Sequence, residues 1–196
     1  MFANRFTALV DACVLAGTLK RNLLLTLAEA EFFRLRWSVQ ILDETQRAIQ
    51  TILEGRNDPE AEAKAARARS AMERAFEEAC VGGIDALLPL VPALPDPNDR
   101  HVVAAALKTA ASVIVTDNLR DFPAEALEPL NLEVRGADAF IADTIALDPG
   151  RAVAAIRRMR ERLRNPAKTP ETLLLDMEAE GLTETVDALK LHVMSL

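Results

Sequence analysis

The sequence predicts an α/β domain in which helices surround a mostly parallel sheet. Two short apolar runs, at residues 6–11 and 113–116, have the length and composition of buried strands, and each is followed or ended by an acid. Between and after them lie stretches with helical periodicity, so strands and helices alternate along the chain. Half of the 196 residues are hydrophobic and 27% are charged, which is enough for a sizeable core. The length suits one domain with a modest appendage, or two small ones.

The N-terminal half contains two predicted strands and three predicted helices. Residues 6–11 form the first strand, which carries Asp11 at its carboxyl end. Residues 33–37 form a brief extended piece, and Ser38 is a typical N-cap for the helix that follows and ends near Gly55. The other two helices are expected over residues 18–30 and 59–79.

The C-terminal half contains two further strands and then only helices. A helix over residues 99–111 precedes the strand at 113–116, and residues 130–134 add another strand. From about residue 137 the pattern is helical throughout, with segments near 137–147, 150–164, 170–180 and 182–191. Trp37 is expected to anchor the core before the helix that carries Glu44.

Composition limits the compartment and the class of protein. Cys13 and Cys80 are far apart and in no metal-ligand spacing, so we expect two buried, reduced thiols and a cytoplasmic protein. The N-terminal residues do not resemble a signal peptide, and no run approaches the ~20 apolar residues that span a bilayer. The net charge of −7 argues against a nucleic-acid partner, but residues 151–168 carry +6.

Acids recur where a parallel sheet would bind a ligand. Asp11 ends the first strand, and Asp117 and Asp121 follow the strand at 113–116. Asp99 lies at the head of a helix, and Glu44 lies in the first half of another. Clustered carboxylates repel one another unless a cation neutralises them, and oxygen ligands without His or Cys favour Mg²⁺ or Mn²⁺. Such a site suits phosphodiester hydrolysis.

Four segments in order and spacing resemble the PIN-domain family, and within it the VapC-like toxins of bacterial toxin–antitoxin pairs. They are TALVDACVL, WSVQILDE, LPDPNDRHVVAAAL and ASVIVTDNLRDFP. The resemblance spans about residues 6–140. It implies a three-layer α/β/α fold with a mostly parallel central sheet over residues 1–140. The helical pattern that follows predicts a C-terminal helical extension packed on that domain over residues 141–196. The resemblance also implies an endoribonuclease that depends on one or two Mg²⁺ or Mn²⁺ ions.

The resemblance carries the family's acids to particular residues of this chain. Asp11, Glu44 and Asp99 match three acids and are the expected metal ligands. The fourth catalytic acid is expected at Asp121, although Asn118 stands where many relatives have Asp, and Asp117 is the other alternative. Four further residues are expected next to the metal ligands, in support of them: Asp96, Thr116, Asp117 and Asn118, with Thr116 orienting a carboxylate or a water.

Simpler explanations exist for several of these residues. Asp99 is also a suitable helix cap, and the Asp117-Asn118 pair is ordinary turn chemistry. His101 is expected to be structural or to support a metal ligand. In the basic helix an apolar stripe leaves four arginines exposed, and they serve as a solvated face, as a grip on RNA phosphates, or as an antitoxin-docking surface: Arg157, Arg158, Arg162 and Arg164.

Three functions follow, in order of support. The first is a metal-dependent ribonuclease, which implies an RNA substrate, a cognate antitoxin of the DNA-binding type, a homodimer and no membrane. The second is a catalytically weak or inactive PIN-like module that binds RNA or a partner, which the Asn118 substitution keeps open. The third is a small-molecule phosphohydrolase, which the absence of a Gly-rich phosphate loop disfavours.

Overall fold

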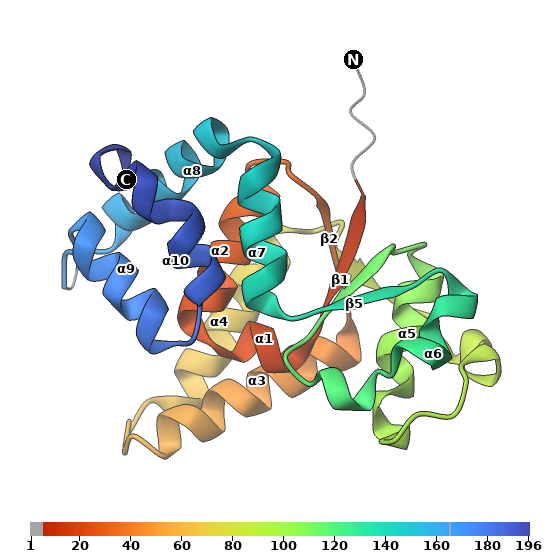
Figure 1. The fold of residues 1–196 in the computed structure, drawn as a ribbon. Helices are drawn as coiled ribbons and strands as arrows, with labels where there is room; N and C mark the ends of the chain where they lie inside the picture. Colours follow the sequence, from red (N-terminus) through yellow and green to blue (C-terminus); the bar gives the residue numbers. More distant parts are fainter. Residues whose placement is uncertain (1–5, 165) are drawn as a thin grey trace. The chain divides into compact units, whose positions relative to one another are not determined.

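The computed structural model describes residues 6–164 and 166–196 (Figure 1). These residues form two compact units. The first contains the described residues up to Gly17 together with Arg34–Arg135, and the second contains Thr18–Phe33 and Gly136–Leu196. The second unit therefore includes one helix from the N-terminal part of the chain. Because of this segment, the two units are not separated by a single boundary in the sequence, such as one at residue 140.

The first unit is built on a five-stranded parallel sheet with the strand order β3-β2-β1-β4-β5. The strands are β1 (Thr7–Val10), β2 (Arg34–Ser38), β3 (Cys80–Val81), β4 (Val113–Val115) and β5 (Glu133–Arg135). β1 and β4 are neighbours in the middle, with Val10 opposite Val115. The chain thus turns to opposite sides after β1 and after β4, and this is where open parallel sheets bind ligands. The predicted α/β class with helices flanking a parallel sheet is confirmed.

The helices of the first unit are α1 (Ala12–Ala16), α3 (Val39–Glu54), α4 (Ala61–Ala75), α5 (Arg100–Lys108) and α6 (Ala124–Leu127). Short 3-10 turns join them: η1 (Asp85–Leu90), η2 (Pro97–Asp99), η3 (Leu119–Asp121) and η4 (Glu128–Leu130). The predicted start of α3 is confirmed, because the Ser38 hydroxyl accepts from the Ile41 amide at 3.1 Å. α1, α3 and α4 pack together through Ala16, Ile49 and Ala65.

Two elements and two cysteines differ from the sequence-based expectation. β3 has only two residues, and α1 only five, so neither produces a detectable periodicity. The prediction of buried cysteines is wrong, since Cys13 and Cys80 are both exposed. Cys80 lies on the edge strand β3, and Cys13 lies on the open side of α1. Trp37, by contrast, is 0% exposed, which confirms its expected place in the core.

The second unit is entirely helical in its C-terminal part, as predicted. It contains α2 (Thr18–Glu29), α7 (Ala137–Leu147), α8 (Pro149–Arg162), α9 (Pro170–Ala179), α10 (Thr183–Leu189) and η5 (Lys190–Ser195). Asp138 on α7 caps α10 by accepting from the amides of Glu184 and Thr185 at 2.9 and 2.8 Å. Arg160 on α8 donates to the carbonyls of Lys168 and Leu196 at 2.7 and 2.9 Å.

Across the two described stretches, none of the helices combines the length and the apolar character needed to cross a bilayer.

Candidate active site

Asp11 lies immediately beyond β1, and hydrogen bonds hold both its backbone and its side chain. Its backbone amide donates to the Val115 carbonyl of β4 at 3.0 Å, which ties the residue to the centre of the sheet. One side-chain oxygen caps α1 by accepting from the Ala12 amide at 2.7 Å. The other accepts from the Thr116 hydroxyl at 2.8 Å. With only 8% of its surface exposed, the carboxylate has one fixed orientation.

Thr116 follows β4 and has no exposed surface. Besides donating to Asp11, its hydroxyl oxygen accepts from the Asn118 backbone amide at 3.1 Å. The hydroxyl proton is directed at Asp11, because an ionised carboxylate can only accept a hydrogen bond. This hydrogen bond fixes the orientation of the Asp11 carboxylate.

Cys13 also touches this pair, and the sequence analysis did not place it there. Its thiol donates to the second Asp11 oxygen at 3.2 Å and lies 3.3 Å from the Thr116 hydroxyl. Partial burial of the sulfur, followed by the negative charge of Asp11, raises the thiol pKa to about 11. The thiol is thus a proton donor at neutral pH. Its position two residues after Asp11 does not predict this contact, because residues i and i+2 of a helix do not face each other.

Asp99 lies just before α5, but it does not act as a cap, since its side chain makes no capping hydrogen bond. One of its carboxylate oxygens is buried without a hydrogen-bond partner. Burial, followed by the charges of Asp11, Asp96 and Asp121 in that order, raises the pKa of Asp99 to about 6. A buried carboxylate oxygen without a hydrogen-bond partner, in the field of other acids, costs the folded protein free energy.

Glu44 is tied to α5 through His101. Its Oε1 atom lies 3.1 Å from Nε2 of His101, which is 5% exposed. His101 in turn lowers the pKa of Asp99, opposing the acids around it. The histidine therefore contacts Glu44 and lowers the pKa of Asp99.

The residues after β4 differ in how close they come to Asp99. The Asn118 side-chain amide donates to the Asp121 carboxylate, and Asp121 is near enough to Asp99 to raise its pKa. Asp117 is exposed, and its backbone amide donates to the Cys13 sulfur. Asp96 caps the turn η2 by accepting from the Asn98 amide at 2.8 Å. Of the alternatives for a fourth acid, Asp121 has the closest electrostatic link to Asp99.

The acids are suitable ligands for a hard cation, although their side chains do not form a complete coordination shell. In the described part of the chain, no three His, Cys, Asp or Glu side chains stand together in a metal-binding arrangement. The buried Asp99 oxygen nevertheless lacks a partner, and the nearby acids destabilise its charge. The donor set is made of oxygens, which is the chemistry that Mg²⁺ and Mn²⁺ prefer.

The four arginines predicted as an RNA grip all lie in the second unit and have different surroundings. Arg157 pairs with Glu161 at 2.9 Å, and Arg162 lies 3.4 Å from Glu29 on α2. Arg158 and Arg162 line one small cleft with Glu29. Arg164 forms an isolated antiparallel bridge with Ala167. Their contact with RNA stays a prediction.

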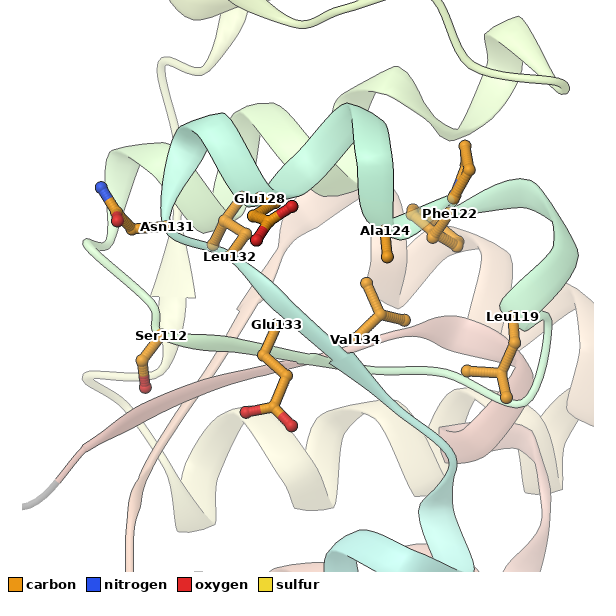
Figure 2. Close-up of a pocket in the computed structure, with 10 residues that line it drawn as sticks. Ser112, Leu119, Phe122, Ala124, Glu128, Asn131, Leu132, Glu133 and Val134 are labelled. Carbon is orange, nitrogen blue, oxygen red and sulfur yellow. The ribbon is translucent and has the colours of Figure 1, made fainter.

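A different surface hollow lies beside the outer strand β5. It has a volume of about 780 Å³ and is lined by residues of the segments flanking β4 and β5 (Figure 2). Asp11, Glu44 and Asp99 are not among its lining residues. The acids of the candidate site and this hollow are therefore separate features of the first unit.

Comparison with known proteins agrees with this architecture. The PIN-domain profile matches residues 7–120, and the profile of the VapC50 C-terminal domain matches residues 137–191. A protein of Mycobacterium tuberculosis strain H37Rv named "Putative ribonuclease VapC50" is 41% identical over 76 residues, which are 39% of this chain and 45% of that protein. The chain thus spans less than half of the length of the curated relative it matches. No solved structure matches.

The two profile matches divide the chain where its pattern changes. Residues 7–120 contain Asp11, Glu44, Asp99 and four of the five strands, and residues 137–191 begin where the chain becomes purely helical. The PIN-domain match covers more than half of the chain and includes the central strands β1 and β4 with the acids that follow them. The chain belongs to the PIN-domain family and is VapC-like within it.

Proposed function

We propose that this protein is a Mg²⁺- or Mn²⁺-dependent endoribonuclease and the toxin of a toxin–antitoxin pair. The observation that supports this most directly is the buried, unpartnered oxygen of Asp99, with Asp11 and Asp121 near enough to raise the pKa of Asp99. A divalent cation removes the repulsion that the protein alone leaves uncompensated. The name of the VapC50 relative supports RNA as the substrate class.

Asp11, Glu44 and Asp99 are the residues that would hold the ion, with Asp121 as the fourth acid. When bound, such an ion supplies an acidified water and a Lewis acid for a phosphate oxygen. Thr116 keeps Asp11 in one orientation, and His101 does the same for Glu44. Preorganisation of this kind lowers the reorganisation needed on binding the ion and its substrate.

The test uses three separate substitutions, Asp11→Asn, Glu44→Gln and Asp99→Asn, with Glu125→Gln as the control. Glu125 is exposed on α6, so the control removes one charge from the same unit without touching the site. Each of the three is expected to lower Mg²⁺-dependent RNA cleavage by at least ~10-fold. Far-ultraviolet circular dichroism checks that each variant folds. Cleavage at the parent rate by all three variants would show that the assignment is wrong.

A non-catalytic module that binds RNA or a partner is the second candidate. Asn118 supports it, because an amide stands where many relatives of the family carry an acid. The two candidates differ in the role of the metal. If the parent protein binds RNA equally well with Mg²⁺ and with EDTA, and never cleaves it, the binding module is the better description.

The remaining partners are also proposals. A VapC-like toxin implies a small DNA-binding antitoxin that occludes the site, a second copy of the chain, and a cytoplasmic location. The antitoxin is tested by co-expressing the protein with the product of the gene immediately upstream. Loss of RNA cleavage in the co-purified complex, with recovery after the partner is removed, is the expected result.

A further inference from the structure

The α2–α8 cleft is a small polar space between two helices of the second unit that pack against each other. It has a volume of about 120 Å³, and residues at the end of α2 and along α8 line it: Thr26, Glu29, Ala30, Ala155, Arg158 and Arg162. Ala155, Arg158 and Arg162 follow one another at spacings of three and four residues, so they share one face of α8. Because the two alanines have short side chains, space for a small ligand remains between the helices.

Arg158 brings a positive charge to this cleft that no acid of the chain is shown to neutralise. Its side chain is exposed, and among the described residues it has no ion-pair partner. Its neighbours on α8 differ in this respect. Arg157 pairs with Glu161 at 2.9 Å, and Arg160 donates to two backbone carbonyls. The guanidinium group of Arg158 is therefore available to a ligand from solution.

Arg162 adds a second cation to the cleft, and Glu29 holds it there. Nη1 of Arg162 lies 3.4 Å from the Glu29 carboxylate, and the two side chains are 66% and 61% exposed. An ion pair this exposed contributes little to stability. An anion with a higher charge than a carboxylate can therefore take the place of Glu29 beside Arg162.

The lining of the cleft favours a phosphate group over a protein partner. Two guanidinium groups bind phosphate oxygens through paired hydrogen bonds, and the Thr26 hydroxyl can donate another. A volume of about 120 Å³ equals that of about four water molecules at ~30 Å³ each, which suits one such group. A protein partner gains most from large apolar or aromatic anchors, and the apolar side chains of this cleft are only two alanines.

The distribution of charge favours the same ligand. The chain has a net charge of −7, whereas residues 151–168 carry +6. An RNA strand is therefore repelled by most of the chain and attracted to the segment that contains α8.

We propose that the α2–α8 cleft binds a backbone phosphate of an RNA strand through Arg158 and Arg162, with a further hydrogen bond from Thr26. Contacts to phosphates fix the position of a strand without reading its bases. Of the four arginines predicted to contact RNA, the cleft thus selects two. The inference rests on the proposed RNA substrate, but it requires neither a bound metal ion nor cleavage.

The test measures binding of the whole chain to a fluorescein-labelled single-stranded RNA of mixed sequence, by fluorescence anisotropy in EDTA. Arg158→Gln and Arg162→Gln are each expected to raise the Kd at least ~5-fold in ~50 mM salt, where charges are weakly screened. In the double variant the slope of log Kd against log salt concentration should fall by about 0.7, because one phosphate of a single strand is no longer neutralised.

Two further variants separate the cleft from general effects of charge and folding. Arg157→Gln removes the same charge from the same helix, but its side chain does not line the cleft, so the Kd should change less than ~2-fold. Glu29→Gln removes the acid that competes for Arg162, so the Kd should fall by roughly 2–3-fold. A damaged protein does not gain affinity, and circular dichroism checks that every variant folds.

The outcomes distinguish the cleft from the nuclease. RNA binding by Arg158→Gln and Arg162→Gln that equals the binding by Arg157→Gln overturns the cleft and leaves the ribonuclease intact. A parent that binds RNA through the cleft but never cleaves it with Mg²⁺ retains the cleft and overturns the nuclease. A parent that binds no RNA overturns the cleft.

Two other results would assign the arginines to a different role and overturn the proposal. In the first, Arg158→Gln and Arg162→Gln lower the free energy of unfolding without changing RNA binding, so the two cations serve only the ends of their helices. In the second, RNA binding is unchanged and both variants no longer co-purify with the product of the upstream gene, so the arginines contact a protein.

Discussion

Replacing Asp99 with Asn is expected to stabilise the metal-free protein while it lowers RNA cleavage by at least ~10-fold. The pKa of Asp99 rises from the ordinary 3.8 to about 6, chiefly because of burial. At 1.36 kcal/mol per unit, a rise of roughly 2 units corresponds to about 3 kcal/mol at most, and partial solvent exposure of the side chain reduces it to about 1–2 kcal/mol. Above pH 6 the folded protein bears this full cost, because its Asp99 is ionised next to other acids.

The pH dependence has a definite sign. Between pH 3.8 and about 6 the folded state binds more protons at Asp99 than the unfolded state, so this residue makes the protein less stable as pH rises through that window. The Asp99→Asn variant lacks this term. The amount by which its free energy of unfolding exceeds that of the parent is expected to be largest above pH 7. By pH 4.5 this difference should fall to less than about half of that value.

Urea unfolding in EDTA, followed by Trp37 fluorescence at pH 7.5 and 4.5, measures this difference. Trp37 is the only tryptophan of the chain and is fully buried in the same unit as Asp99, so it reports on that unit. Glu125→Gln removes an exposed charge from the same unit and should leave the midpoint nearly unchanged. Two results would refute the reasoning. One is an Asp99→Asn variant that is no more stable than the parent at pH 7.5, and the other is a stability difference between variant and parent that is the same at both pH values.

Three further outcomes are expected. Adding 5 mM Mg²⁺ should raise the urea midpoint of the parent but not of Asp11→Asn or Asp99→Asn, because only the intact cluster gains from a bound ion; equal shifts in all three proteins would contradict this. Thr116→Val should cost about 1–2 kcal/mol and lower cleavage, whereas Thr116→Ser, which keeps the bond to Asp11, should retain most of both. Cys13 should react with iodoacetamide at pH 7.5 on the order of 100-fold more slowly than a free thiol, since its pKa is about 11, and Asp11→Asn should accelerate it; a fast parent reaction would exclude the protonated thiol.

Most of the scaffold was predictable because its elements have their own periodicity. The helix after Ser38, the strand at Val113–Val115 and the helices from Ala137 onward all appear within a few residues of where their patterns place them. The two-residue strand β3 and the short helix α1 were missed, since a pattern needs more than one period to be visible. The cysteines were misplaced because residue type gives an average burial and says nothing of which side of α1 or which sheet edge is open.

The sequence by itself determined that acids follow strands and precede helices, which places Asp11 and Asp99 at element ends whatever the detailed packing. Only the tertiary structure decided how those acids interact, because hydrogen bonds between residues more than a hundred positions apart, such as Thr116 to Asp11, depend on the neighbouring positions of β1 and β4. It also decided that Glu44 meets His101, that Asp121 and not Asp117 raises the pKa of Asp99, and that α2 joins the helices after residue 136. Local patterns follow from short-range sterics and burial, whereas these pairings follow from the strand order, which no single segment encodes.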